Sequence, residues 1–166
     1  MRRRLAVIVA ADMVGYSRLM EADRAAAIAA VRRLRETLFQ PELDRRGGEL
    51  LKSLGDGWIF AFPSVSEAVE AAQAVQTMLA VDPRVQVRVA IHIGEIADDG
   101  ADLYGGGLNI AARLQAEAPP GGVMISDDLH RQLDLRLAEG FAPAGTFELR
   151  NIARPVAAWR WRPARE

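Results

Sequence analysis

The feature that most constrains the fold is a run of seven apolar residues, 5–11, that ends at Asp12. A continuous apolar run of this length is typical of a buried strand and does not approach the length of a membrane span. It follows Met1 and three arginines, so a secretory signal segment is the alternative interpretation. We favour the strand and place it over residues 4–12. Because an unpaired carboxylate beside a core is costly, Asp12 needs a hydrogen-bond partner, a proton or a metal ion.

The overall composition is that of an ordinary globular protein. Half of the 166 residues are apolar and 26% are charged, which predicts a single domain over residues 1–166. The net charge of −1 gives no basic field, so we expect no nucleic-acid partner. The absence of cysteine excludes disulfides, thiolate metal sites and a cysteine nucleophile. Lys52 is the only lysine in a chain otherwise rich in arginine.

Patterned segments follow the first strand in an order that favours a ferredoxin-like core. Apolar residues spaced three to four apart predict two amphipathic helices, the second with Ser64 as N-cap and Glu67 completing a capping box. Alternation and apolar runs predict three further strands. The predicted strands are 4–12, 49–53, 58–62 and 85–93, and the predicted helices are 25–40 and 64–80. The order strand, helix, strand, strand, helix, strand places the first strand beside the hairpin of the second and third.

Further elements are expected after this core. They are a Gly/Asp-rich loop over 94–107, a helix over 108–117, a strand over 123–126, a helix over 128–137 capped by Asp127 or Asp128, and strands over 145–149 and 156–162. We interpret Trp159 and Trp161 as packing residues of an edge strand rather than as a stacking surface for nucleic acid. The two histidines are assigned to a polar strand face, His92, and to a helix surface, His130, and they form no His-Asp-Ser set.

A second carboxylate is expected to meet Asp12. Asp56 lies in the turn Gly55–Gly57 between two apolar stretches, and if the flanking strands are neighbours both acids project at one end of the sheet. Hard oxygen ligands without a nearby histidine or thiolate favour magnesium or manganese over zinc. The alternative makes Asp56 a turn former and Asp12 the cap of a helix over 13–20. We favour the metal site.

Lys52 lies four residues before Asp56 on the strand that enters the turn. Its compact ammonium group suits an acceptor on a base ring better than a guanidinium would. The alternative is a solvated lysine on an edge strand.

The segment 102–113 is the second candidate for chemistry. Three glycines, 105–107, precede a helix, as at anion sites, but no Gly-Lys-Ser/Thr follows, so this is not a Walker loop. Asn109 and Arg113 are four residues apart and share one helix face, where they could hold a sugar oxygen and a phosphate. The alternative pairs Arg113 with Glu117 and uses Asn109 as a cap.

Taken together, these residues resemble the catalytic domain of class III adenylate/guanylate cyclases, and bacterial members most of all. The motifs that carry the resemblance are Asp12 with Val14-Gly15-Tyr16-Ser17, then Lys52-Ser53-Leu54-Gly55-Asp56-Gly57, then Asp102-Leu103-Tyr104-Gly105 with Asn109-Ile110-Ala111-Ala112-Arg113. They keep the family's order over nearly the whole chain. The resemblance implies an α/β fold, an α+β sandwich with a ferredoxin-like βαββαβ core and additional C-terminal strands and helix.

The resemblance also implies a reaction and a substrate. Family members convert a nucleoside triphosphate to a 3′,5′-cyclic monophosphate and pyrophosphate. By motif position, Asp12 and Asp56 would hold two Mg²⁺ or Mn²⁺ ions. Lys52 and Asp102 would contact the purine, and this pair favours adenine, so the expected enzyme is an adenylate cyclase acting on ATP in the cytoplasm.

The remaining roles implied by the resemblance belong to the sugar and the phosphates. Asn109 would orient the ribose and Arg113 would stabilise charge on the phosphates. Family members are antiparallel homodimers in which the two aspartates and the Asn/Arg pair of one site come from different subunits. The chain departs from the family where a further lysine often contacts the triphosphate: Arg150 stands there, with Arg154 close by. Gly106 stands where relatives often have an acid.

Three alternatives stay open from the sequence. The first is a guanylate cyclase, which the Lys52/Asp102 pair disfavours. The second is a catalytically silent dimerisation or nucleotide-sensing module, supported by the arginine at position 150. The third is a general phosphohydrolase, for which a general base beyond the acids is missing. The sequence shows no sensor domain, so the activating signal is open.

Overall fold

A computed structural model describes residues 2–81 and 84–164. Its strands are β1 (Arg2–Met13), β2 (Glu49–Ser53), β3 (Gly57–Phe62), β4 (Val87–Asp98), β5 (Leu103–Tyr104), β6 (Val123–Ser126), β7 (Ala142–Phe147) and β8 (Val156–Trp161). Its helices are α1 (Tyr16–Ala22), α2 (Arg24–Arg33), a π-helical stretch η1 (Leu34–Phe39), α3 (Gln40–Arg46), α4 (Val65–Ala80), α5 (Gly106–Glu117), α6 (Asp127–His130) and α7 (Leu135–Ala138). Among these described helices, none is long and apolar enough to cross a membrane.

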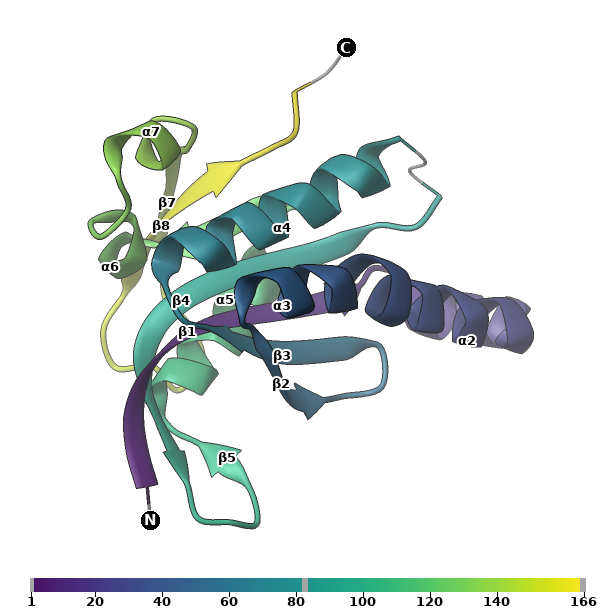
Figure 1. The fold of residues 1–166 in the computed structure, drawn as a ribbon, viewed down its shortest axis with the longest axis horizontal. Coiled ribbons are helices and arrows are strands. Elements are labelled where there is room, and N and C mark those ends of the chain that lie inside the picture. Colours follow the sequence, from purple (N-terminus) through teal and green to yellow (C-terminus); the bar gives the residue numbers. More distant parts are fainter. Residues whose placement is uncertain (1, 82–83, 165–166) are drawn as a thin grey trace.

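The described strands form one mixed sheet in the order β2-β3-β1-β4-β6-β8-β7, with β5 pairing to β4 (Figure 1). The pairs β2–β3, β3–β1 and β1–β4 are antiparallel, and β1 lies between β3 and β4. This confirms the predicted ferredoxin-like core and the predicted position of the first strand beside the hairpin. The C-terminal strands extend the same sheet, because β6 pairs in parallel with β4.

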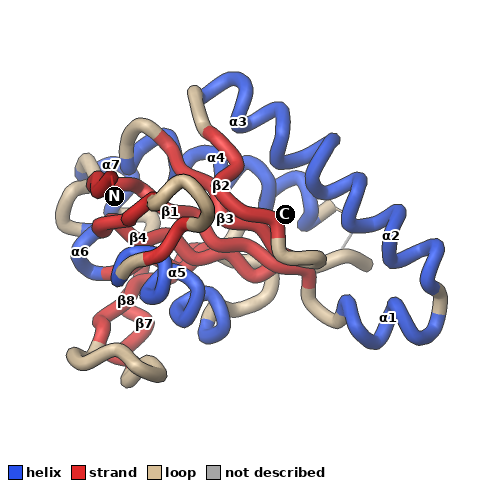
Figure 2. The backbone as a smooth tube through the Cα atoms, turned by 90° about the horizontal axis from the view of Figure 1, so that it is seen from below, coloured by secondary structure: helices blue, strands red, loops and turns tan. Residues whose placement is uncertain are grey.

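Helices cover both faces of the sheet, and the alternation along β1 assigns its side chains to them (Figure 2). Val7, Val9 and Ala11 belong to the larger core cluster, which they share with α4 and η1. Ala6, Ile8 and Ala10 belong to a second cluster with Leu108 and Ala111 of α5. Since successive side chains of a strand point to opposite faces, Asp12 belongs to the face that α5 covers.

The first predicted helix continues further than expected. It runs as α2, η1 and α3 to Arg46 and ends at Gly47, which has the left-handed φ of 69°. Pro41, which has no backbone N–H to donate, lies within this continuous helix directly after the π-helical stretch η1. Ser64 caps α4 as predicted, since its hydroxyl accepts from the backbone N–H of Glu67 at 3.2 Å.

The predictions of a loop over 94–107 and of a single helix over 128–137 were wrong in detail. The expected loop 94–107 instead contains the end of β4 and all of β5, because Ile96 is buried and continues the core beyond Gly94. The expected helix 128–137 is two short helices. Ser126, not Asp127 or Asp128, caps α6 by accepting from Leu129 N at 3.3 Å.

The last strand is not the edge strand that was predicted. β8 lies between β6 and β7, so β7 forms the edge. Trp159 and Trp161 pack against the larger core cluster, as the packing interpretation requires. Trp159 also stacks on His130 with ring centroids 3.7 Å apart, and its indole N–H donates to Asp127 Oδ1 at 3.0 Å.

Candidate active site

The two acids meet where β1 ends against the β2–β3 hairpin. Asp12 pairs in register with Gly57, and Met13 N donates to the carbonyl oxygen of Asp56 at 2.9 Å. A Cβ at Gly57 would lie 3.1 Å from both Ala11 O and Asp12 Cβ, so a side chain there would crowd the acid. The structure therefore brings Asp12 and Asp56 to one end of the sheet, as the strand order predicts. Asp12 is not a helix cap, because the N-cap residue of α1 is Gly15.

The electrostatic environment of Asp12 combines opposing influences. Burial raises the pKa of its carboxyl above the usual value, and the neighbouring charge of Asp56 raises this pKa further. The charge of Arg88 and a hydrogen bond from Gln115 act in the opposite direction on the same pKa. Two half-buried carboxylates that repel each other form a place where a cation would be stabilised.

Arg88 and Gln115 are site residues that sequence reasoning missed. Arg88 is the register partner of Asp12 on β4, and its Nε donates to the carbonyl oxygen of Ala118 at 3.1 Å. Gln115 on α5 donates from Nε2 to Asp12 Oδ1 at 2.7 Å. Arg88 lies on the predicted polar face of its strand. This position would have indicated a site residue only if the pairing of β4 with β1 had been known. Nothing in the sequence marks Gln115.

The two carboxylates fit a hard divalent cation whose remaining ligands come from the substrate and from water. Among the described residues, no group of three or more His, Cys, Asp and Glu side chains could hold a metal ion. Mg²⁺ is typically bound by one or two carboxylates together with substrate phosphates and water. Asp12 and Asp56 match this pattern and do not match an all-protein cage for zinc or calcium.

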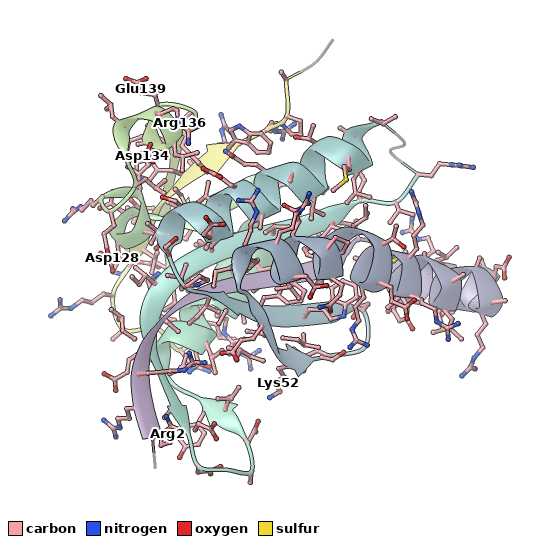
Figure 3. The ribbon with its side chains drawn as sticks, in the orientation of Figure 1. Arg2, Lys52, Asp128, Asp134, Arg136 and Glu139 are labelled. Carbon is pink, nitrogen blue, oxygen red and sulfur yellow. The ribbon has the colours of Figure 1, made fainter. Side chains whose placement is uncertain are left out.

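Lys52 and Asp102 lie side by side although 50 residues separate them. The Lys52 ammonium lies 3.4 Å from Asp102 Oδ1, and the two side chains are 40% and 63% exposed. Lys52 lies near the hairpin end of β2 and projects toward the side on which β5 lies (Figure 3). The backbone N–H of Leu103 donates to Asp102 Oδ1 at 2.8 Å, which orients the carboxylate. A donor and an acceptor are thus presented together at an accessible surface.

Asn109 and Arg113 face away from the acid pair of their own chain. Arg113 donates from Nε to the carbonyl oxygen of Arg150 at 3.1 Å, whereas Gln115, two positions further along α5, contacts Asp12. Two positions correspond to about 200° around a helix, so these side chains leave α5 on opposite sides. Asn109 is exposed, and the N-cap of α5 is Gly105, so the capping alternative for Asn109 is wrong.

A cavity formed by described residues lies away from these groups. It has a volume of about 720 Å³ and lies between the C-terminal end of α4 and residues 162–164. Its lining includes Gln76, Val85 and Arg162, and none of the acids, Lys52, Asn109 or Arg113 lines it. The candidate site is an open surface in two parts.

Comparisons with known proteins agree with this architecture. Putative adenylate cyclase 3 of Rhizobium meliloti (strain 1021) is 40% identical over 169 residues, which cover 98% of this chain and 29% of that protein. An adenylate cyclase of Streptomyces coelicolor is 32% identical over 132 residues, which cover 79% of this chain and 34% of that protein. The crystal structure of an adenylate/guanylate cyclase/hydrolase from Silicibacter pomeroyi is 35% identical with a TM-score of 0.89, covering 98% of this chain and 99% of that one. No model of a known protein family matches the chain.

The fold and the two-part site define the class of nucleotidyl cyclase catalytic domains. The chain belongs to the class III adenylate/guanylate cyclase family, as its full-length match to the Silicibacter structure shows. It spans about a third or less of the length of the two curated relatives, 29% and 34%.

Proposed function

We propose that residues 1–166 act as one catalytic domain that converts ATP to 3′,5′-cyclic AMP and pyrophosphate in the cytoplasm. The proposed cofactors are two Mg²⁺ or Mn²⁺ ions per site, and the proposed active form is a homodimer. The contact between Lys52 and Asp102 is the observation that favours ATP over GTP as the substrate. It presents an ammonium donor and a carboxylate acceptor side by side, beside the hairpin that holds Asp56.

Asp12 and Asp56 would hold the cations in this proposal. Bound divalent ions would supply Lewis-acid activation of the ribose 3′-hydroxyl and would neutralise charge on the triphosphate. The chain's own contribution is to hold two carboxylates together against their repulsion, through the β1–β3 register and the contact between Met13 N and Asp56 O. In the reaction the ribose 3′-oxygen would form a bond to the α-phosphorus, the bond from that phosphorus to the bridging oxygen of the β-phosphate would break to release pyrophosphate, and the hydroxyl proton would pass to water.

Lys52 and Asp102 would select the base. Adenine offers a ring-nitrogen acceptor and an exocyclic amine donor, which match an ammonium and a carboxylate respectively. Guanine reverses this order of donor and acceptor along the same edge. Because the two side chains are in contact with each other, they would present the donor and the acceptor to the base as a pair.

Asn109 and Arg113 would act on the nucleotide held by the partner subunit. Arg113 leaves α5 on the side opposite to Gln115, and Asn109, four residues before Arg113, shares the face of Arg113, which supports a role at a site other than that of Asp12 in the same chain. A two-fold axis would place them over the acids of a second copy. Asn109 would orient the ribose, and Arg113, released from the Arg150 carbonyl, would stabilise charge on the phosphates. Arg150 and Arg154, both exposed, are the candidates for a triphosphate contact.

The test is a cyclase assay with purified protein, Mn²⁺, and either ATP or GTP. We expect cyclic AMP as the main product and loss of at least about 99% of the activity in Asp56→Asn, since removing one ligand of a catalytic metal removes its charge stabilisation. Asp44→Asn removes an exposed carboxylate in α3, which accepts from Gln40 Nε2 at 2.8 Å, and should keep full activity.

Three outcomes would contradict parts of the proposal. Equal rates for Asp56→Asn and the wild type would refute the metal assignment. Faster production of cyclic GMP than cyclic AMP would make the protein a guanylate cyclase. Nucleotide binding by a dimer without any turnover would identify a silent nucleotide-sensing module.

A further inference from the structure

The amide of Gln115 donates a hydrogen bond to the Asp12 carboxylate. Its Nε2 lies 2.7 Å from Asp12 Oδ1, at the short end of the range for N–H···O hydrogen bonds, and 103 residues separate the two in sequence. Both side chains are half-buried, so the bond is partly shielded from water. A contact of this kind restricts the side-chain rotamer of Asp12.

The turn of α5 that carries Gln115 is itself firmly held. Leu114 is fully buried in a cluster with Ala90 and Met124 on the adjacent strands. At the end of the same helix, the carbonyl oxygen of Ala118 accepts from Arg88 Nε at 3.1 Å. Arg88 is the register partner of Asp12, so two hydrogen bonds join this end of α5 to the strand ends that carry the acid.

The geometry points to Gln115 as a positioning residue that orients Asp12 for a divalent cation. This inference rests on the proposed metal-dependent function of the acid pair. A carboxylate has about four acceptor positions, and one amide donor at Oδ1 uses one of them. Oδ2 and the second lone pair of Oδ1 stay available for a hard cation.

An amide suits this role better than the other polar side chains would. A neutral donor orients the carboxylate without adding a charge that would compete with the cation, as a lysine or arginine would. Partners that hydrogen-bond to metal ligands typically change metal affinity by about ten- to a hundredfold when they are removed. Gln115 therefore contributes to the metal site without contacting the metal.

The experiment measures Mn²⁺ binding directly, through the loss of the electron paramagnetic resonance signal of free Mn²⁺ on titration with protein. The test variant is Gln115→Leu, which keeps the size of the side chain and removes the donor. Gln40→Leu is the matched control, because Gln40 Nε2 donates to Asp44 Oδ1 at 2.8 Å in α3, away from the site. We expect the Mn²⁺ dissociation constant to rise about tenfold in Gln115→Leu and to stay unchanged in Gln40→Leu.

The same titration on Asp56→Asn, together with thermal unfolding of every variant, separates the possible failures. Mn²⁺ binding by the wild type but not by Asp56→Asn would support the metal site. If Gln115→Leu then binds Mn²⁺ as tightly as the wild type, Gln115 does not position Asp12. Tighter binding by Gln115→Leu would also overturn the inference, since the amide would then compete with the cation. If Asp56→Asn and the wild type bind equally, the metal assignment fails and the role of Gln115 fails with it. A weaker Mn²⁺ affinity with an unchanged unfolding temperature is the supporting result.

Discussion

At the scale of single residues, Asp12 and Asp102 are held by different kinds of neighbour. Asp12 accepts from the side chain of Gln115, whereas Asp102 accepts from the backbone N–H of Leu103 and contacts Lys52. Sequence reasoning proposed the acids and the lysine as candidates, because such residues are costly or conspicuous where they stand, and the structure places Lys52 beside Asp102. It could not identify Gln115, since an amide on a helix has many ordinary roles and only the packing of α5 shows its partner.

Asp102→Asn tests the proposed contact with the base. The substitution removes a charged acceptor, and a hydrogen bond to a charged group contributes about 1.5–3 kcal/mol, so kcat/KM for ATP should fall about tenfold or more. The rate with GTP should fall less, so the preference for ATP narrows. Asp98→Asn makes the same charge change in the same loop and keeps an acceptor for Gly100 N, so it is the control. Equal losses with ATP and GTP would show that Asp102 does not read the base.

Because His92 is buried, we predict that the protein loses stability in mild acid. The ring is 4% exposed beneath α5, its Nδ1 lies 2.7 Å from Ser126 Oγ, and burial lowers the pKa of His92 below its usual value despite the nearby charge of Asp128. The unfolded chain therefore binds a proton at a higher pH than the folded one. The stabilising effect is fully present above the unfolded pKa of about 6.5 and is lost as the pH falls through this value toward the folded pKa.

Urea unfolding between pH 8 and pH 5 measures this effect, because this range brackets the pKa of histidine in the unfolded chain. In the wild type the free energy of unfolding should decrease as the pH falls, and the slope should be smaller in His92→Gln. His130→Gln removes the other histidine and is the control. An unchanged slope in His92→Gln would assign the acid sensitivity to other groups.

At the scale of elements, the predictable parts were those with a strong local pattern. The hairpin, the cap of α4 at Ser64 and the alternation that begins at Val87 all follow from short-range rules. The extension of β4 through Gly94 did not follow, because glycine is a poor strand former and its fit depends on the close approach of α5. The interior position of β8 likewise depends on β7, whose sequence carries Pro143 and Gly145 and predicts a strand only weakly.

The approach of α5 to the sheet leads to a prediction for two adjacent glycines. A Cβ at Gly107 would lie 2.8 Å from Glu95 O and from Gly94 C, so backbone would have to move. Gly107→Ala should lower the free energy of unfolding by about 2 kcal/mol, as overpacking typically does. Gly106 has no neighbouring atom within 4 Å of such a Cβ, so Gly106→Ala should be neutral or stabilising by about 0.5 kcal/mol. Urea unfolding measures the free energy of unfolding of both variants. Similar free energies for the two would show that α5 is not tightly packed against the sheet.

At the scale of the whole molecule, α5 connects the two parts of the site. One side of the helix fixes Asp12 through Gln115, and the other side presents Asn109 and Arg113 away from the acids. Sequence spacing predicted that Asn109 and Arg113 share a face, but only the docked helix shows that this face does not serve the acids of the same chain. This arrangement is the basis for the proposed homodimer, in which a second copy would complete the site.

Mixing two inactive variants tests this proposal directly. In an Asp56→Asn homodimer both sites lack a metal ligand, and in an Arg113→Ala homodimer both lack the guanidinium. A heterodimer of the two would carry both defects in one site and none in the other. With random pairing, half of the dimers are mixed and each has one of two sites intact, so about a quarter of the wild-type activity should return. Asp12→Asn mixed with Asp56→Asn is the matched control and should stay inactive, because each site of every dimer then lacks a carboxylate. If the Asp56→Asn and Arg113→Ala mixture also stays inactive while both variants still dimerise, the acids and Arg113 do not come from different subunits.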